Sequence, residues 1–430
     1  MTMDGAFNLF QATMLRWRAR HPYNAVHVAR VDSALDPDRL RAAIAAVLAG
    51  AGLTGYRLDA ARLRFEWRGG VARVRLAVAD AGADAQAAVR ATIERLLDHP
   101  FPADGEYEPF AFEAVRDGGG FWLALAYDHI VAGGDSAVAL LGALVARYAG
   151  PMPIAPLDRH PARFRRMIAR HPIAAAAAMA GLPRLAWRAR RARRAPGLER
   201  REAANAFVMA SLPGADEKIG VAAKRWGVTR NDVLMAAVIR AVAGLKPPAG
   251  PASRRREVAV ASVMNIRSEC AAPVERVFGQ FLSSFRASHP DPRGVPLADV
   301  ARVVHAESRD VRARRRYLRS LAALAVSGFA WRLVGEDRRH SIYAKHYPVW
   351  AGLTTIVLPG LWSAMAPSAG ARPAAYRRGV STGPLAPVVV AATFTGTSLE
   401  LGVSFRPAAV PPDALARTLE SLAAELSGIS

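Results

Sequence analysis

Apolar residues recur with two different spacings along the chain, and both spacings occur in each half. Helical spacing after a capping residue or a proline predicts helices. Short alternating or continuous apolar runs bounded by Gly, Asp or Asn predict strands. The predicted helices lie at 36–49, 84–97, 135–148, 215–226, 231–243 and 412–426. The predicted strands lie at 71–78, 110–115, 121–127, 207–212, 258–263, 388–395 and 398–405.

Turn and cap residues support several of these predictions. Asp36 followed by Pro37 is typical of an N-cap and a first-turn proline. The turn at 117–120 predicts a hairpin between its flanking strands. Neither half shows strict alternation of strands and helices, which favours α+β layers over a Rossmann sheet. No glycine-rich dinucleotide fingerprint follows a strand, and no phosphate-binding Walker loop is present in the sequence.

The chain is long enough for two domains. It has 430 residues, of which 52% are hydrophobic, and this is sufficient for two cores. The segment 151–201 is rich in proline and arginine, and we interpret it as a surface connection. The expected division is an N-terminal domain at 1–165, a basic linker at 166–204 and a C-terminal domain at 205–430.

The formal charge of +22 has two interpretations. One is a coding bias toward arginine, in which case the charge has no functional role. The other is a binding partner that carries negative charge. For the clusters at 188–194 and 312–319 we expect solvated helix faces first, and an acidic carrier protein or the phosphates of CoA second. Peripheral contact with an anionic membrane comes third. Nucleic acid is not expected as a partner, because no aromatic residues interleave with the charges.

The single cysteine, Cys270, excludes an intramolecular disulfide and a cysteine-rich zinc site. The histidines show no metal-ligand spacing, so no metal is expected. The first residues lack the pattern of a signal peptide, and no apolar stretch reaches the roughly 20 residues that span a bilayer. We therefore expect a cytoplasmic protein.

The segment 127–136 is the most informative for chemistry, because a strand ends there, a Gly-Gly turn follows and a helix begins. His129 at the strand end is placed to face a cleft. A neutral imidazole can take a proton from an amine or hydroxyl that attacks a carbonyl. The helix N-terminus adds backbone donors. The alternative is a structural histidine held by hydrogen bonds.

This segment resembles the HHxxxDG motif of condensation domains, chloramphenicol acetyltransferase-like enzymes and wax-ester synthase/diacylglycerol acyltransferases. Asn265 and Arg267 resemble the end of the family's "VNxR" strand, and Ser381 with Thr382 resembles a segment of the wax-ester synthase type. Further matches follow in family order, so the resemblance spans nearly the whole chain. They lie at 7–36, 231–237, 278–280 and 393–405.

The resemblance implies a V-shaped pseudo-dimer of two chloramphenicol-acetyltransferase-like α/β sandwich domains, with a tunnel between them and His129 at its middle. An acyl thioester, on CoA or on the phosphopantetheine of an acyl carrier protein, enters one mouth. A small-molecule acceptor enters the other. No tightly bound cofactor is implied. We assign donor binding to Arg188, Arg191, Arg315, Ser381 and Thr382.

The motif departs from the family at two positions. Asp128 stands where the first His usually is, and it could stabilise a protonated imidazole. Gly133 stands where the family has an Asp that pairs with the arginine, here Arg267, while Gly134 matches the motif's Gly. Asp135 or Asp128 could replace that Asp, although the pattern favours Asp135 as the helix N-cap.

The expected function is that of a stand-alone condensation-type acyltransferase. It would form an ester or amide from an acyl thioester and a hydroxyl or amine acceptor, in secondary-metabolite or lipid biosynthesis. The altered motif motivates an alternative, a catalytically silent condensation-like domain that binds a carrier protein or another enzyme.

Overall fold

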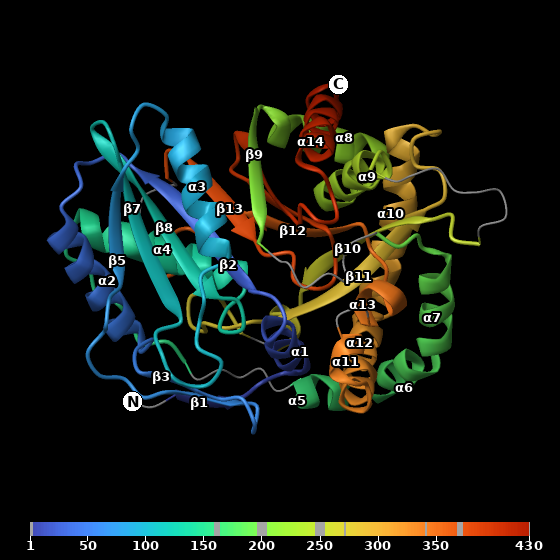
Figure 1. The fold of residues 1–430 in the computed structure, drawn as a ribbon, viewed down its shortest axis with the longest axis horizontal. Coiled ribbons are helices and arrows are strands. Elements are labelled where there is room, and N and C mark those ends of the chain that lie inside the picture. Colours follow the sequence, from blue (N-terminus) through green and yellow to red (C-terminus); the bar gives the residue numbers. More distant parts are fainter. Residues whose placement is uncertain are drawn as a thin grey trace. The chain divides into compact units, whose positions relative to one another are not determined.

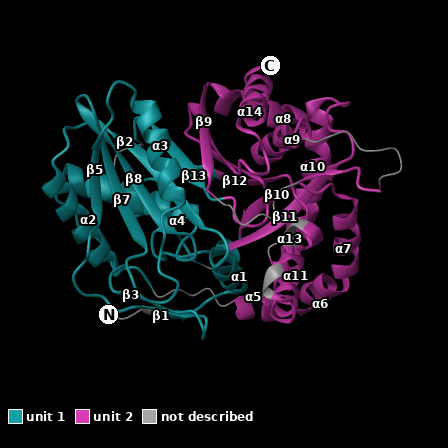
Figure 2. Cartoon of the chain, in the orientation of Figure 1, with its two compact units in different colours: residues 1–163, 266–281, 356–381 teal, residues 164–265, 282–355, 382–430 magenta. Residues whose placement is uncertain are grey.

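The computed structural model describes residues 3–158, 164–195, 204–245, 254–270, 272–339, 342–367 and 373–429 (Figure 1). The chain divides into two compact units (Figure 2). Unit 1 comprises Met1–Arg163, Ile266–Phe281 and Ile356–Ser381. Unit 2 comprises Phe164–Asn265, Leu282–Thr355 and Thr382–Ser430.

This division differs from the predicted boundaries at 1–165, 166–204 and 205–430. Two segments of the second half belong to unit 1. The described part of the predicted linker holds three helices of unit 2, and its residues 196–203 lie outside the described residues. These helices are α5 (Phe164–Arg170), α6 (Pro172–Ala180) and α7 (Leu182–Arg191). Composition suggested a linker, but long-range strand pairing decides which segments form a unit.

Unit 1 is built on a five-stranded sheet with the order β13-β2-β8-β7-β5. All neighbours are antiparallel except β5 and β7, which are parallel. The outermost strand β13 comes from the second half of the sequence and pairs with β2. The strands are β2 (Asn24–Val31), β5 (Leu76–Asp80), β7 (Phe110–Asp117), β8 (Gly120–Asp128) and β13 (Tyr376–Val380).

Helices cover both faces of this sheet, as Figure 1 also shows. On one face α3 (Ala85–Leu97) reaches Glu113 of β7 through Thr92, whose hydroxyl donates to the carboxylate at 3.0 Å. On the other face α4 (Gly134–Ala149) begins next to His27 of β2. Successive strand residues alternate between faces, and the register places Glu113 and His27 on opposite sides. Helix α2 (Pro37–Ala51) packs on α4.

A second, four-stranded sheet of unit 1 has the order β1-β4-β3-β6. Its strands are β1 (Met3–Ala6), β3 (Tyr56–Asp59), β4 (Arg64–Trp67) and β6 (Gly105–Glu106). Helix α1 (Leu9–Arg18) follows β1, and its cap Asn8 forms a capping box with Gln11. The short 3₁₀ helix η1 (Ser268–Cys270) also belongs to unit 1.

Unit 2 is built around a six-stranded sheet with the order β11-β10-β12-β14-β15-β9. Its strands are β9 (Ala206–Pro213), β10 (Val258–Asn265), β11 (Leu282–His289), β12 (Ala351–Val357), β14 (Val388–Phe394) and β15 (Ser398–Phe405). Its remaining helices are α8 (Ala215–Trp226), α9 (Arg230–Ala243), α10 (Leu297–Ala313), α11 (Tyr317–Leu333), α12 (Glu336–Arg339), α13 (Ile342–His346) and α14 (Pro412–Ser427). Helices α8, α9, α10, α11 and α14 pack on its strands.

Several local predictions are confirmed. Asp36 caps α2 with Pro37 in its first turn, and the hairpin of β7 and β8 turns at the predicted place. The strand predicted at 71–78 begins only at Leu76, and Val71 is 89% exposed. Helix α9 begins one residue earlier than predicted, because Thr229 caps it in a capping box with Asp232. No helix in the described ranges is long and apolar enough to cross a membrane.

Helix α4 must approach the segment after β12 closely, and Gly142 makes this approach feasible. A Cβ on Gly142 would lie 1.9 Å from the carbonyl oxygen of Trp362. We predict that Gly142→Ala lowers the free energy of unfolding by about 1–3 kcal/mol, because the helix or the segment must move. Chemical denaturation measures the change.

Gly150 at the C-terminus of the same helix provides the matched control. A Cβ there meets no atom within 4 Å, so Gly150→Ala should change stability little. Equal stability of the Gly142 and Gly150 variants would contradict the close approach.

Candidate functional site

The loop between β8 and α4 carries His129, and hydrogen bonds within unit 1 hold its backbone. The amide of His129 donates to Tyr23 O at 3.2 Å. The side-chain amides of Gln11 and Gln280 donate to the carbonyls of Ile130 and His129, both at 2.9 Å. The amide of Gly133 donates to Gly279 O at 3.0 Å. The loop is thus tied to α1 and to the segment Ile266–Phe281.

The imidazole of His129 is packed between two tyrosine rings. Tyr23 stacks on it with centroids 5.5 Å apart, and Tyr127 meets it edge-on at 5.6 Å. The residue keeps only 8% of its surface exposed. Burial lowers the pKa of His129 to about 4, against a smaller opposing effect of the Ala132 hydrogen bond. The ring is therefore neutral near pH 7.

The position of the imidazole proton follows from one contact. Nδ1 of His129 lies 3.0 Å from the carbonyl oxygen of Ala132, which can only accept. Nδ1 therefore carries the proton, and Nε2 presents a lone pair. No hydrogen-bond partner of Nε2 occurs among the residues that the structure describes. The loop thus fixes the tautomer that a general base needs.

A buried chain of polar groups lies beside His129 on the same face of the sheet as α4. Nδ1 of His27 makes a short hydrogen bond with the hydroxyl of Tyr376, and Nε2 lies 3.4 Å from the hydroxyl of Tyr127. Burial lowers the pKa of His27 well below its ordinary value, so this imidazole is neutral. A neutral imidazole has one donor and one acceptor, so one tyrosine donates to it and the other accepts.

Arg378 adds a positive charge to this region. It lies opposite His27 in the register of β13 and β2, and it is buried. Burial lowers the pKa of Arg378 to about 10, so the guanidinium stays charged near pH 7. Its charge also lowers the pKa values of His27 and His129, after the larger effect of burial. Arg378 therefore helps to keep both imidazoles neutral.

Sequence reasoning missed His27, Tyr376 and Arg378 as site residues. The signal for His27 was a histidine with apolar neighbours on both sides in its strand, at a position that the structure buries completely. Arg378 and Tyr376 gave no comparable local signal, because they reach the region through pairing of β13 with β2.

The carboxylate of Asp128 is directed at α1. It forms a short ion pair with Arg18 and accepts a hydrogen bond from Tyr107 at 2.7 Å. Its second oxygen lies 3.4 Å from the amide of Ile130. Arg18 also donates to the carbonyl of Pro102 at 2.9 Å. These contacts tie the end of β8 to α1, and they engage the carboxylate that we expected to stabilise a protonated His129.

Asp135 makes the ion pair that the resemblance assigns to the missing motif Asp. Its Oδ2 lies 2.8 Å from Nε of Arg267, and both side chains are largely buried. Arg267 also donates to the hydroxyl of Ser136 at 2.8 Å and to the carbonyl of Val277 at 2.8 Å. The prediction that Asp135 caps the helix is wrong, because the N-cap of α4 is Gly133, without a side-chain cap. The carboxylate is thus two positions further along the chain.

Ser136 and Gly279 complete the attachment of α4. The hydroxyl of Ser136 donates to Gly279 O at 3.2 Å, and it lies 3.2 Å from the amide of Gly279. The guanidinium of Arg267 stacks over Phe281 at 4.4 Å. The predicted supporting residues Gly133, Gly134, Asp135 and Arg267 therefore meet in one cluster of unit 1.

The other predicted site residues lie elsewhere. Asn265 is exposed at the end of β10 in unit 2. The amide of Ser381 donates to Asn24 O at 2.9 Å in unit 1. Thr382 donates from its amide to Asn205 at 3.2 Å in unit 2.

The three arginines assigned to donor binding all belong to unit 2. Arg188 pairs with Glu307 at 2.8 Å, and Arg191 pairs with Glu257 at 2.7 Å. Arg315 lies between α10 and α11 with a positive φ of 48°. Their assignment to a donor stays a prediction.

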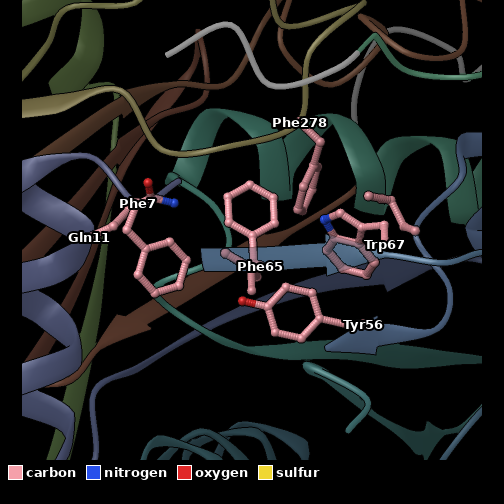
Figure 3. A pocket seen from close by; sticks show the side chains of 8 residues that line it. Phe7, Gln11, Tyr56, Phe65, Trp67 and Phe278 are labelled. Carbon is pink, nitrogen blue, oxygen red and sulfur yellow. The ribbon is translucent and has the colours of Figure 1, made fainter. Parts of the chain in front are cut away.

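A narrow pocket opens beside the His129 loop (Figure 3). The space inside it that a water-sized group can enter is small. Five of the eight lining side chains are aromatic and none is charged, so the pocket suits an apolar group. The lining residues are Phe7, Gln11, Leu53, Tyr56, Phe65, Trp67, Val131 and Phe278. Among the described residues no cluster of three metal-ligating side chains occurs.

No protein-family model and no curated protein matches the chain. Solved structures match it over almost its full length. The first condensation domain of the CDA synthetase has 17% identity and a TM-score of 0.68, covering 100% of this chain and 97% of that chain. The EpoB cyclization-docking bidomain from Sorangium cellulosum has 16% identity and a TM-score of 0.70, with 99% and 84% covered.

A third solved structure is the starter condensation domain of rhizomide synthetase, in complex with C8-CoA and Leu-SNAC. It has 14% identity and a TM-score of 0.66, covering 99% of this chain and 94% of that chain. Likeness at these identities establishes the fold. The chain therefore has the two-unit α+β fold of condensation domains, and the predicted fold class is confirmed. The tunnel and the V shape stay predictions.

Removing the charge of Asp135 tests the buried ion pair. We predict that Asp135→Asn lowers the free energy of unfolding by about 3 kcal/mol, because Arg267 keeps its charge without the counter-ion. Asp80→Asn is the matched control, since Asp80 pairs with Arg116 on the surface of the same unit and should contribute little. Urea unfolding of both variants provides the comparison, and equal effects would refute the role of the buried pair.

Proposed function

We propose that the chain is a condensation-type acyltransferase that joins an acyl group from a thioester to an amine or hydroxyl. The observation that carries the proposal is the fixed tautomer of His129, in a chain with the full condensation-domain fold. The donor is an acyl group on CoA or on the phosphopantetheine of a carrier protein. The acceptor is a small molecule, and no tightly bound cofactor takes part in this scheme.

In the proposed reaction His129 acts as general base through Nε2. The attacking nitrogen or oxygen of the acceptor gives its proton to Nε2 as it bonds to the thioester carbonyl carbon. The tetrahedral species then expels sulfur, and the proton passes from the imidazolium to the thiolate. One C–N or C–O bond forms, one C–S bond breaks, and a free thiol leaves. Ala132 holds Nδ1–H throughout, which keeps the ring oriented.

The environment of the imidazole keeps the free base available. A ring with a pKa near 4 exists almost entirely as the free base at neutral pH, although the low pKa also lowers its affinity for the acceptor's proton. The same burial makes the imidazolium unstable, which favours return of the proton to the leaving thiolate. Positioning of donor and acceptor supplies the rest of the acceleration.

An apolar acyl group is the donor that we favour. The aromatic pocket beside Val131 in the loop supports this choice, because five of its eight lining side chains are aromatic and none is charged. The rhizomide starter domain, whose structure contains C8-CoA and Leu-SNAC, suggests the same chemistry for a protein of this fold. On the same grounds we propose a role in secondary-metabolite or lipid biosynthesis, and we keep the cytoplasm as the expected location.

A catalytically silent domain that binds a carrier protein is the second candidate. It is favoured by Asp128 at the position of the motif's first His, since its carboxylate is committed to Arg18. Against it, Asp135 restores the ion pair with Arg267, and the tautomer of His129 is the one that catalysis requires.

We predict that His129→Ala lowers the rate of acyl transfer by about 10²–10⁴-fold, the usual contribution of a general base. Octanoyl-CoA and leucine N-acetylcysteamine thioester are the first donor and acceptor to use, with a wider panel if needed. Mass spectrometry measures the acylated product. His289→Ala on β11 is the matched control and should keep full activity.

The two candidate functions differ in this assay. Turnover by the unaltered chain that survives His129→Ala would refute the mechanism. Absence of product from every donor and acceptor, together with binding of a carrier protein, would support the silent domain.

The low pKa of His129 predicts the pH profile. With an alcohol as acceptor, whose attacking group does not titrate in this range, kcat should stay flat from about pH 8 down to about pH 5 and fall only toward pH 4. The direction follows because protonation below the pKa removes the lone pair of the base. An acidic limb centred near pH 6.5, which is the ordinary histidine value, would contradict the proposed burial effect.

A further inference from the structure

Three helices of unit 2 carry most of the exposed apolar side chains in the described part of the chain. Eleven large apolar residues are exposed, and six of them lie on α6, α7 and α11. Helix α11 packs on α6 and α7, and α6 packs on α7, so the three helices are neighbours. The six residues are Ile173, Met179, Trp187, Val326, Phe329 and Leu333. We call these helices with their exposed side chains the α6–α7–α11 surface.

Helix α11 presents a continuous apolar stripe. Val326, Phe329 and Leu333 are 49%, 66% and 74% exposed, and their spacing of three and four residues places them on one face. Leu321 and Gly328 on the other side are buried. The helix is therefore apolar on its inner and its outer face, which an ordinary surface helix avoids.

The only charged side chains that the same helices carry are positive. Their sequences contain no Asp or Glu and six Arg. Arg188 and Arg191 are neutralised by Glu307 and Glu257 on other elements. The other four arginines make no ion pair among the described residues, and three of them are exposed. These three are Arg184, Arg190 and Arg332.

Positive charges also converge at the end of α7. The pKa of His346 is lowered by burial and then by Lys345, Arg194 and Arg190. Trp187 lies at this border, with the guanidinium of Arg191 5.1 Å from its ring centroid. An exposed apolar stripe beside a basic rim with an interfacial tryptophan matches the features of peripheral membrane binding.

We propose that the α6–α7–α11 surface binds an anionic lipid membrane, with Phe329 and Leu333 entering the acyl boundary and Arg184 and Arg190 contacting the lipid headgroups. Positive charge without acidic residues favours an anionic partner surface. The large exposed apolar side chains favour a surface that can bury them. A soluble acidic protein explains the charge but not the length of exposed apolar helix. This proposal does not depend on the proposed function.

Vesicle co-sedimentation tests the proposal with the full chain. Vesicles of mixed phosphatidylcholine and phosphatidylglycerol should bind the protein at low salt, and vesicles of phosphatidylcholine alone should bind it at least about tenfold more weakly. Raised ionic strength should weaken binding to the mixed vesicles, because headgroup contacts are screened. Absence of binding to the mixed vesicles at low salt would overturn the proposal.

Substitution of the apolar stripe tests which face binds. Phe329→Ser with Leu333→Ser should reduce vesicle affinity at least about tenfold, because two large side chains no longer enter the bilayer. The matched control is Val221→Ser with Val303→Ser, two exposed positions on α8 and α10 of the same unit, which should bind like the unaltered protein. All four positions are exposed, so thermal unfolding should change little in either variant. Equal affinity of the two double variants would overturn the assignment.

Removal of two positive charges from the α6–α7–α11 surface is the last test. Arg184→Gln with Arg190→Gln should lower affinity for the mixed vesicles at least about tenfold and leave the weak binding to phosphatidylcholine unchanged. Arg57→Gln with Arg90→Gln, at exposed positions of unit 1, is the control and should retain binding. If vesicles do not bind but an acidic carrier protein does, and the Phe329 and Leu333 variant loses it, the surface is a protein-docking site and the membrane proposal fails.

Discussion

The ion pair between Arg267 and Asp135 is the interaction on which the geometry of the His129 loop depends. A largely buried guanidinium is costly to desolvate unless its donors are used. Arg267 uses them on the Asp135 carboxylate, the Ser136 hydroxyl and backbone carbonyls of its own segment. Two of these partners stand in the first turn of α4, directly after the loop. The segment Ile266–Phe281 and α4 are therefore held together, and the loop between β8 and α4 has both ends fixed.

The chemistry of His129 follows from this fixed loop. Ala132 can accept from Nδ1 only because the loop folds its carbonyl back toward the ring. Packing between Tyr23 and Tyr127 then removes water, and Arg378 on β13 adds a positive charge nearby. Burial and the charge of Arg378 both disfavour the imidazolium, against a smaller opposing effect of the Ala132 hydrogen bond. Burial and a nearby positive charge thus keep His129 neutral near pH 7, and backbone geometry fixes its tautomer. The proposed role as general base uses this neutral form.

Local sequence patterns predicted much of the fold and the position of His129, because caps, turns and strand periodicity act over a few residues. Asp36 with Pro37 and the hairpin turn at 117–120 are examples. The patterns wrongly favoured Asp135 as a cap over Asp135 as the partner of Arg267, because both roles place a carboxylate at the start of a helix. They also could not place Arg378, since its position depends on pairing of β13 with β2, and no local signal records that pairing.

The distribution of arginine separates charge that serves the fold from charge that meets a partner. Arg18 and Arg267 are buried beside carboxylates of unit 1, and Arg188 and Arg191 are paired in unit 2. The formal charge of +22 counts all of them alike, so by itself it indicates no ligand. What distinguishes α6, α7 and α11 is the combination of acid-free sequence and exposed apolar side chains, which internal stability does not require. An anionic membrane explains both features, because its headgroups can bind the arginines and its acyl chains can bury the apolar side chains.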